Sequence, residues 1–245
     1  MLKWFSKKQE EELSSLDFSV LKTDIHSHFI PAIDDGSPNM ETTIRLLQQM
    51  QKLGFSKVIT SPHVMSDLYK NSSEIILKGL AMVRAELKVQ NIHIEVDAVA
   101  EYYLDYEFEK KIGEERLLTF GDNYLLVELS FVEPPKNLFD IIFRLQLEGY
   151  KVVLAHPERY HYFRMQDYKN LVNREVFLQI NWLSLIGYYS LQIKHKTEKL
   201  ISQDMVSFVG TDCHNMNHAE LYKKCQTKKA WHDLFNSGKL LNNCL

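Results

Sequence analysis

The sequence predicts an α/β fold in which seven short strands, each followed by a helix, form a closed or nearly closed barrel. Apolar runs rich in β-branched residues recur between residues 21 and 214, separated by stretches with helical spacing of apolar residues. Several runs are apolar throughout, which is typical of parallel strands buried on both faces. Seven such units in about 225 residues fit a barrel. A doubly wound open sheet is the alternative, but no glycine-rich phosphate motif follows the first run.

The predicted elements alternate along the chain. Strands are expected over residues 21–26, 56–63, 93–101, 124–130, 150–159, 177–184 and 205–214. Helices are expected over residues 37–54, 71–91, 135–149, 168–176 and 190–203, with a short helix before residue 124 and a helical tail from residue 219. In the first helix, Ser37 is the expected cap, Pro38 fills the first turn and Gly54 ends the helix.

Length and composition favour one large domain. The 245 residues are 45% hydrophobic, which is enough for a large core, and no linker, repeat or low-complexity stretch divides residues 21–245. Residues 1–20 are mostly polar and match neither a signal peptide nor a membrane span. We therefore expect a polar leader over 1–20, a single domain over 21–245 and no membrane insertion.

Charge and cysteine content argue against nucleic-acid-binding functions and against an oxidising compartment. The net charge is -3 and no block of basic residues is present, which argues against a nucleic-acid partner and hence against a nuclease or proofreading module. The three cysteines form no C-x-x-C motif and cannot all pair, which indicates a reducing compartment. A cytoplasmic location is the resulting expectation.

Ionisable side chains follow the ends of most predicted strands. The first strand ends in His26 and His28, which alternate so that both rings can point to one face, and Asp35 lies on the next loop. The later strand ends carry His63, Glu101, Glu128, His156, the neutral Asn181, Asp212 and His214. Since the C-terminal ends of barrel strands converge on one mouth, these side chains are expected to share a pocket.

This set of histidines and carboxylates predicts a metal site. For a single member such as Glu128, hydrogen bonding at a strand end is the simpler role. As a set, however, the groups would be clustered, unpaired and mutually repelling unless cations compensate them. The nine candidate ligands exceed what one ion takes, so about two or three ions are implied. Such ions make a bound water acidic and neutralise anionic oxygens, which suits hydrolysis.

Six motifs in chain order resemble those of the polymerase-and-histidinol-phosphatase (PHP) superfamily. They are DIHSHFIPAIDDG, TSPH, AVAEYY, VELS, AHPERY and GTDCHN, and they span essentially all of residues 21–215. Within the superfamily the chain is most similar to the capsule-associated bacterial protein-tyrosine phosphatases. The resemblance implies a distorted (β/α)7 barrel of the PHP type with a trinuclear site, usually containing manganese, with iron, zinc and magnesium as alternatives.

The resemblance also implies an activity, a partner and a ligand assignment. The activity is hydrolysis of phosphotyrosine by a metal-bound hydroxide, on a membrane-associated bacterial tyrosine kinase that controls capsular or exopolysaccharide synthesis and export. One ion would be held by His26, His28, Glu101 and Asp212. A second would be held by Glu101, Glu128 and His156, with Glu101 bridging. The third would take Asp35, His63 and His214.

Two further residues are expected to act on phosphate. Arg159, in HPERY, matches the family's phosphate-holding arginine, whose fork of donors suits a phosphoryl group. The relatives carry an arginine-proline pair shortly after HN, whereas HNMNHAELY contains His218 and no arginine. His218 would replace that arginine as a partial cation or as a neutral donor. As a cation it would make turnover fall at high pH.

The substrate is the least determined feature of the sequence. Protein-bound phosphotyrosine is favoured by aromatic residues after the strand ends, with packing at the barrel rim as the alternative for each: Tyr102, Tyr103, Phe131, Tyr160 and Tyr162. A small-molecule phosphomonoesterase such as histidinol phosphatase is the main alternative, and a metal-stabilised binding subunit of an export complex is another. A cysteine nucleophile is excluded, since no cysteine begins a C-x5-R motif. The native ion, the phosphoprotein and the oligomeric state stay open.

Overall fold

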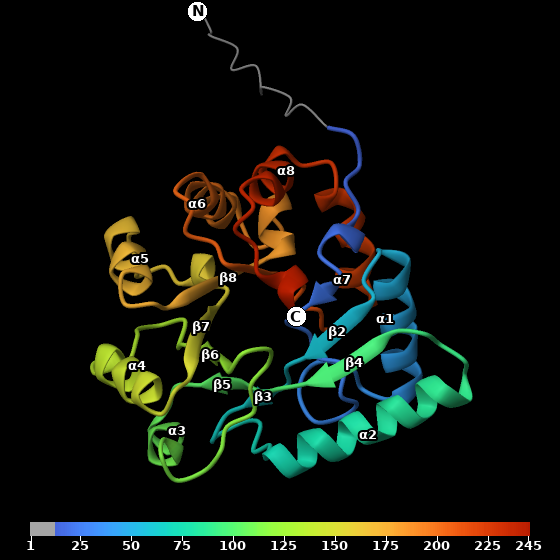
Figure 1. Ribbon diagram of the computed structural model, residues 1–245, viewed down its shortest axis with the longest axis horizontal. Coiled ribbons are helices and arrows are strands. Elements are labelled where there is room, and N and C mark those ends of the chain that lie inside the picture. The colour runs from blue at the N-terminus through green and yellow to red at the C-terminus, as the bar shows by residue number, and fades with distance from the viewer. Residues whose placement is uncertain (1–12) are drawn as a thin grey trace, which may run out of the picture.

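The computed structural model describes residues 13–245, in which short strands alternate with helices (Figure 1). The strands are β1 Thr23–Asp24, β2 Lys57–Thr60, β3 His63–Val64, β4 Glu95–Ala98, β5 Glu101–Tyr103, β6 Tyr124–Glu128, β7 Lys151–Ala155, β8 Phe177–Asn181 and β9 Phe208–Gly210. Every pairing between these strands is parallel.

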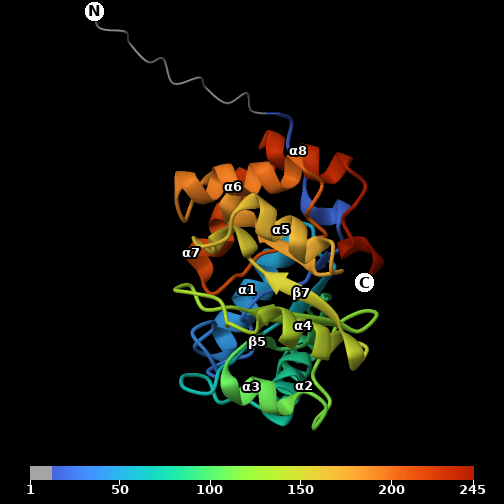
Figure 2. The same ribbon diagram turned by 90° about the vertical axis from the view of Figure 1, so that its left-hand side faces the viewer.

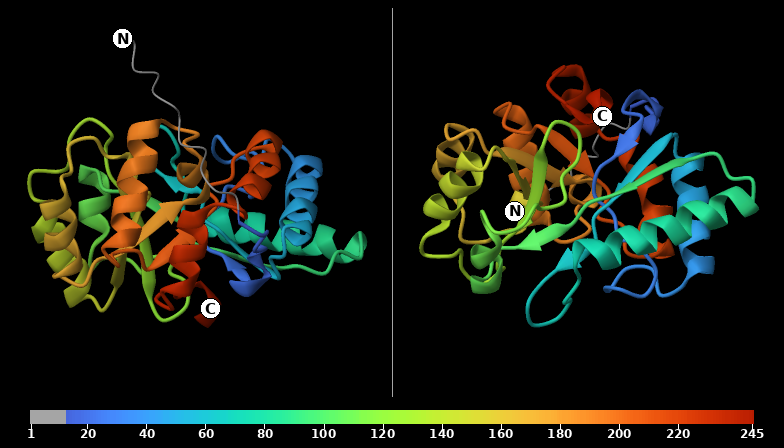
Figure 3. Two further views of the ribbon diagram at one scale, coloured as in Figure 1. Left: turned by 90° about the horizontal axis from the view of Figure 1, so that it is seen from above. Right: turned by 60° about the horizontal axis from the view of Figure 1, so that its bottom comes forward.

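The helices lie outside the strands. They are α1 Met40–Lys52, α2 Ser73–Val89, α3 Tyr106–Lys111, α4 Leu138–Leu147, α5 Met165–Val172, α6 Leu191–Ser202, α7 Met216–Leu221 and α8 Lys229–Asn236. Helix α2 contacts β4, α4 contacts β7 and α5 contacts β8 (Figures 1 and 2). Seen from above, the strands lie between α1 and α2 on one side and α4 to α6 on the other (Figure 3). Within the described part of the chain, none of the helices has the length and apolar character needed to cross a membrane.

The strands form two sheets that join into a nearly closed barrel. The smaller sheet has the order β1-β2-β4 and the larger one the order β3-β5-β6-β7-β8-β9. A parallel bridge between Ser27 and Cys213 connects the chain after β1 to the chain after β9. Next to it, the backbone N–H of Asp212 donates to the carbonyl of His26 at 2.7 Å. The predicted α/β barrel with seven strand positions is therefore confirmed.

Two of the seven predicted strands are broken, which the sequence pattern did not reveal. The strand expected over 56–63 consists of β2 and β3, and between them lies Pro62, whose nitrogen has no hydrogen to donate to a neighbouring strand. The strand expected over 93–101 consists of β4 and β5. Each break moves the chain from the smaller sheet to the larger one. His63 and Glu101 then begin the new strands, directly opposite each other.

Helix ends also depart from the prediction. Asn39 caps α1, not Ser37, which donates its hydroxyl to the carbonyl of Asn39 instead. The helix expected over 168–176 is α5, which begins and ends earlier. The tail expected from residue 219 is divided into α7, a 3-10 helix and α8. These differences lie where capping and tertiary contacts decide the ends of helices.

The structure describes only part of the polar leader predicted over residues 1–20. Its first twelve residues lie outside the described residues, while residues 13–20 pack against the domain. The indole N–H of Trp231 donates to the carbonyl of Leu16 at 2.8 Å. Phe18 is fully buried, with its ring centre 4.0 Å from that of Trp182. The described residues of this segment, 13–20, therefore contact the folded domain, and the division at residue 20 stays a prediction.

Apolar side chains fill the barrel interior. The cluster consists of Ile25, Ile59, Val99, Phe120, Leu126, Val153, Ala155 and Phe208. The end of the chain closes one end of this interior, because the side-chain amide of Asn242 donates to the carbonyls of Thr23 and Val209 and Leu245 packs on the cluster. The opposite end, where the strands have their C-termini, is left for a polar pocket.

Phe18→Ala should lower the free energy of unfolding by about 3–5 kcal/mol, because it leaves a cavity between Phe55, Trp182 and Trp231. The matched control is Phe143→Ala, which removes a ring that is 57% exposed and should change stability by less than about 0.5 kcal/mol. Urea unfolding of both variants measures the difference. Equal effects would contradict the inclusion of residues 13–20 in the folded domain.

Candidate metal centre

Of the nine predicted metal ligands, seven lie at or after the C-terminal ends of strands, and two, His63 and Glu101, begin β3 and β5. The nine are His26, His28 and Asp35 after β1, His63 in β3, Glu101 in β5, Glu128 in β6, His156 after β7, and Asp212 and His214 after β9. Their ring nitrogens and carboxylate oxygens approach one another to between 3.0 and 3.7 Å. The structure therefore brings together residues that are far apart in the sequence.

His26, His28, Glu101 and Asp212 form the deepest group. The Nε2 atoms of His26 and His28 lie 3.3 and 3.7 Å from Oε2 of Glu101. The same two atoms lie 3.5 and 3.4 Å from Oδ1 of Asp212. All four side chains are buried. Two imidazole nitrogens and two carboxylate oxygens around one point are a suitable ligand set for a divalent transition metal.

Glu101 connects this group to a second one. Its Oε1 lies 3.0 Å from Nε2 of His156, which in turn lies 3.4 Å from Oε1 of Glu128. Nδ1 of His63 lies 3.1 Å from Oε2 of Glu101 and 3.5 Å from Oε2 of Glu128. The two oxygens of Glu101 thus face different sets of ligands, as those of a bridging carboxylate do.

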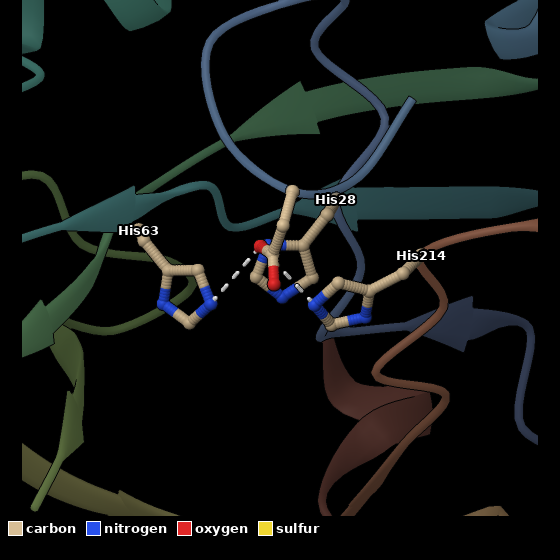
Figure 4. Close-up of side chains that lie close together, drawn as sticks. His28, His63 and His214 are labelled. Carbon is tan, nitrogen blue, oxygen red and sulfur yellow. Dashed lines mark ion pairs between the residues drawn. The ribbon is translucent and has the colours of Figure 1, made fainter. Parts of the chain in front are cut away.

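A third group lies nearer to solvent. Oδ1 of Asp35 is 3.6 Å from Nε2 of His63 and 3.5 Å from Nε2 of His214. His28 belongs to the same group, whose ligand atoms all lie within 4.8 Å of one another. Figure 4 shows the rings of His28, His63 and His214 gathered around one space. The Asp35 side chain is 51% exposed, so this group opens towards the surface.

Among the described residues, four buried polar atoms that face into these groups make no hydrogen bond. They are Nε2 of His26, Nε2 of His28, Nδ1 of His63 and Oε2 of Glu101. Leaving a buried polar atom unpaired costs about 1–3 kcal/mol. Because the four atoms face common points, a cation bound there would satisfy them together. The residues present therefore fit divalent metal ions.

Two residues that the sequence did not single out orient the innermost histidines. Nδ1 of His26 lies 2.7 Å from Oε1 of Gln179, and Nδ1 of His28 lies 2.8 Å from Oδ2 of Asp34. In each ring, donation from Nδ1 leaves the lone pair on Nε2 directed at the carboxylates, which is typical of metal-binding histidines. Asp34 adjoins the predicted ligand Asp35, but only the turn decides which of the two acids faces inward.

The backbone around the ligands is constrained. His156 and Asp212 have φ angles of 33° and 52°, in the left-handed region that few residues other than glycine adopt. Such conformations persist where the surrounding structure enforces them, and they are frequent at functional sites. Gly36 is needed for a different reason: a Cβ there would lie 2.2 Å from the carbonyl oxygen of His28. The acidic loop therefore folds directly onto that ligand.

Burial and charge pairing shift the pKa values of the ligands in opposite directions. Burial lowers the pKa of His26, but the carboxylates of Glu101 and Asp212 outweigh this effect and raise the pKa to about 9. Burial and the neighbouring charge of Arg159 lower the pKa of His156 to about 4. The carboxylates of Glu101 and Asp212 thus favour a positive charge at this point, which a bound cation would supply.

Arg159 lies on the wall of the same pocket, a cavity of about 360 Å³. Its Nη1 donates to Oδ2 of Asp212 at 3.1 Å, and Nδ2 of Asn181 donates to the same oxygen at 2.6 Å. The guanidinium carbon lies 4.6 Å from the ring centres of both Phe131 and Tyr189. Among the described residues this is the one side-chain hydrogen bond found for Arg159, so the rest of its donor fork can meet a ligand.

His218 lines the pocket, but its surroundings do not favour a cation. Its Nδ1 accepts from the backbone N–H of His214 at 3.5 Å, and its Nε2 lies 3.2 Å from the hydroxyl of Tyr188. Burial and the charge of His214 lower the pKa of His218 below its usual value. Of the two roles expected for His218, the cationic one is therefore disfavoured, and a neutral donor is the role that fits.

The aromatic side chains are arranged differently from the prediction. Of the five aromatic residues expected around the pocket, only Phe131 lines it. Tyr102 and Tyr160 are buried, and their hydroxyls accept backbone N–H groups of the core. Tyr189 lines the pocket instead. It lies after the 3-10 helix Trp182–Ile186, an element that the periodicity of apolar residues does not predict.

The barrel and its three connected ligand groups define the class of a metal-dependent hydrolase of the α/β-barrel type. The chain belongs to the CpsB/CapC family, since the family model described as capsular polysaccharide synthesis, CpsB/CapC, matches residues 22–231.

Curated relatives match most of the chain and share moderate identity with it. The chain is 30% identical over 196 residues to the tyrosine-protein phosphatase YwqE of Bacillus subtilis, which covers 79% of this chain and 77% of the relative. It is 25% identical over 213 residues to the tyrosine-protein phosphatase CpsB of Streptococcus agalactiae, covering 82% and 88%. The putative tyrosine-protein phosphatase CapC of Staphylococcus aureus is 24% identical over 220 residues, covering 89% and 83%.

Solved structures agree with this placement. One match comes from the crystal structures of YwqE from Bacillus subtilis and CpsB from Streptococcus pneumoniae, described as unique metal-dependent tyrosine phosphatases. Its TM-score is 0.78 at 27% identity, covering 90% of this chain and 94% of that chain. A histidinol phosphate phosphatase from Lactococcus lactis has a TM-score of 0.55 at 15% identity, covering 92% and 94%, which shows a shared fold alone. The resemblance predicted from the six motifs is confirmed.

Glu101→Gln should weaken metal binding by more than the roughly 10–100-fold typical of a lost outer partner, because Glu101 is in contact with two ligand groups. Glu158→Gln is the matched control, since Glu158 is equally buried but, in the described part of the chain, its carboxylate accepts from Asn181 and Ser184 and faces none of the ligand groups. Elemental analysis of both purified variants measures the metal content. Metal loss in the control variant, or full metal content in Glu101→Gln, would contradict the assignment.

Proposed function

We propose that this protein is a metal-dependent protein-tyrosine phosphatase built as a single PHP-type domain. The observation that carries the proposal is the convergence of nine candidate metal-ligand side chains beside a cavity of about 360 Å³, whose wall includes six of them and Arg159. The tyrosine-phosphatase names of its relatives support the reaction, and the capsular polysaccharide description of its family supports the context. A membrane-associated tyrosine kinase of capsule or exopolysaccharide export is the proposed phosphoprotein, and the cytoplasm the proposed location.

The proposed cofactor is a set of three divalent ions, with manganese as the native metal. The first ion would be held by His26, His28, Glu101 and Asp212. The second would be held by Glu101, Glu128 and His156, and the third by Asp35, His63 and His214. The distances support these sets, and they also place His63 within reach of the second set and His28 within reach of the third.

The chain's own residues would bind and orient the phosphoryl group. When bound, the ions supply an acidic water as nucleophile near neutral pH and neutralise phosphoryl oxygens. Arg159 would hold the remaining oxygens with the donors that Asp212 leaves free, since a planar fork matches a phosphoryl group. His218 would donate one further hydrogen bond in its neutral form. A phenol with a pKa of about 10 is a better leaving group than an alkyl alcohol, so less help from a general acid is needed.

A thiol route to the same product is disfavoured by the positions of the cysteines. Cys213 and Cys225 are buried, and burial raises the pKa of both thiols well above the usual value. A buried neutral thiol is a poor nucleophile. Cys244 is exposed, but it lies at the C-terminal end of the chain and does not line the pocket. Cys213 is therefore best explained as a packing residue between two ligands.

The shape of the pocket favours a phosphate on an exposed chain segment. Two residues that line the pocket are open to solvent, since the Asp35 side chain is 51% exposed and Phe131 is 41% exposed. An exposed ring beside the phosphate-binding arginine offers an apolar surface for a phenyl group. A small-molecule phosphomonoesterase, such as a histidinol phosphatase, shares the fold and remains the second candidate.

A chelator should abolish turnover of p-nitrophenyl phosphate, and added manganese should restore it, because every proposed catalytic step depends on the metal centre. Iodoacetamide should change turnover little, since the two cysteines nearest the core are buried. Cys244→Ser, which removes the exposed thiol, is the control for indirect effects of the reagent. Inactivation by iodoacetamide in that variant, with activity surviving chelation, would refute the metal-dependent mechanism.

A tyrosine-phosphorylated peptide should be hydrolysed with kcat/KM at least about tenfold higher than histidinol phosphate or a phosphoserine peptide, a preference of about 1.4 kcal/mol. The reason is the exposed ring of Phe131 at the pocket. Steady-state kinetics at equal metal loading measure the three substrates. If histidinol phosphate is preferred, the small-molecule reaction replaces the one proposed.

A further inference from the structure

Arg159 is held by two aromatic rings in addition to its ion pair with Asp212. Its guanidinium carbon lies 4.6 Å from the ring centre of Phe131 and 4.6 Å from that of Tyr189. Phe131 lies on the loop after β6, whereas Tyr189 lies on the loop after β8. No ring contact between Phe131 and Tyr189 is found in the described part of the chain, so they approach Arg159 from different sides. We call Phe131, Arg159 and Tyr189 the arginine clamp.

Both rings of the arginine clamp are themselves fixed. The ring of Phe131 stacks on the ring of His156, with centres 5.7 Å apart and planes 23° from parallel. The hydroxyl of Tyr189 accepts from Nδ2 of Asn181 at 3.2 Å. The same amide nitrogen donates to Asp212, so one side chain connects Tyr189 to a metal ligand. The clamp is therefore tied to the metal centre on both sides.

The clamp restricts Arg159 in a way that matters for binding an anion. An arginine side chain has several rotatable bonds, and ordering it when a ligand arrives lowers affinity. Rings against the guanidinium leave its in-plane N–H groups as the exposed donors. One of these donors meets Asp212, and the others remain for the cavity that all three clamp residues line.

We propose that Phe131 and Tyr189 are positioning residues for phosphate, which orient the free edge of Arg159 towards the phosphoryl oxygens. The inference rests on the proposed phosphatase function and extends it to two residues outside the proposed ligand set, which act through Arg159. Tyr189 is the sharper test of the two, because Phe131 is also exposed enough to touch the substrate ring directly.

The experiment is a double-mutant cycle in the metal-loaded protein. Tyr189→Leu should lower kcat/KM for p-nitrophenyl phosphate by about tenfold or more, because Arg159 loses one wall of the clamp. Tyr189→Phe keeps the ring and should stay within about twofold of wild type. Arg159→Ala should lower kcat/KM by about a hundredfold. Adding Tyr189→Leu to Arg159→Ala should then change it by less than about twofold, because the clamp has nothing left to position.

Binding of inorganic phosphate to the manganese-loaded protein, measured by calorimetry, gives a readout independent of turnover. The dissociation constant should rise in Tyr189→Leu and in Arg159→Ala, and the double variant should match Arg159→Ala. The matched control is Phe139→Leu, which removes a ring 4.7 Å from the guanidinium carbon of Arg174 outside the pocket. Phosphate binding and turnover should both be unchanged in that variant.

Two results would overturn the arginine clamp. One is a Tyr189→Leu effect of the same size with and without Arg159, which would mean that Tyr189 acts independently of the guanidinium. The other is loss of metal in Tyr189→Leu, which would mean that it acts through Asn181 and Asp212. If phosphate binding weakens in Tyr189→Leu only when Arg159 is present, but the wild-type protein hydrolyses no phosphomonoester, the proposed function fails while the arginine clamp stands.

Discussion

The site depends on the burial of one carboxylate among four histidines. Glu101 is fully buried, and its oxygens lie between 3.0 and 3.7 Å from ring nitrogens of His26, His28, His63 and His156. A buried carboxylate requires compensating charge, because desolvation strongly disfavours the ionised form. The surrounding histidines nevertheless hold the pKa of Glu101 well below its usual value, against the effect of burial. The ligands from the other strands are thus arranged around a negative charge that the fold places at the centre.

The broken strands explain how that charge reaches the centre. In an unbroken barrel strand each side chain follows the alternation of its neighbours. Here the chain leaves one sheet and enters another just before His63 and Glu101, which then stand opposite each other at the start of β3 and β5. The left-handed backbone at His156 and Asp212 likewise takes these two side chains out of the regular alternation of β7 and β9. Local departures from regular structure therefore set the ligand geometry.

The sequence predicted the parts of the site that follow from strand ends, and it did not predict the parts that depend on loops. Apolar runs ending in His26, Glu128 or Asp212 already placed these residues at one mouth, because parallel strands converge there. His28 pairs with Asp34 rather than with Asp35 because of a turn that Gly36 permits. The periodicity of the sequence does not predict this turn. Tyr189 was missed for the same reason: its contact with the pocket depends on a 3-10 helix and on long-range packing.

Asp212 joins the two halves of the site. Its Oδ1 faces the nitrogens of His26 and His28, and its Oδ2 accepts from Arg159 and Asn181. A carboxylate that is hydrogen-bonded or paired on both sides already has a fixed orientation. It therefore loses little conformational entropy when a ligand binds. It also holds Arg159 against a residue of the proposed first ligand set, so that the residues that would hold the ion and the donors that would bind phosphate share one orientation. The proposed metal coordination and the proposed phosphate binding would therefore depend on one carboxylate, since moving either Arg159 or the histidines would displace the group that the other contacts.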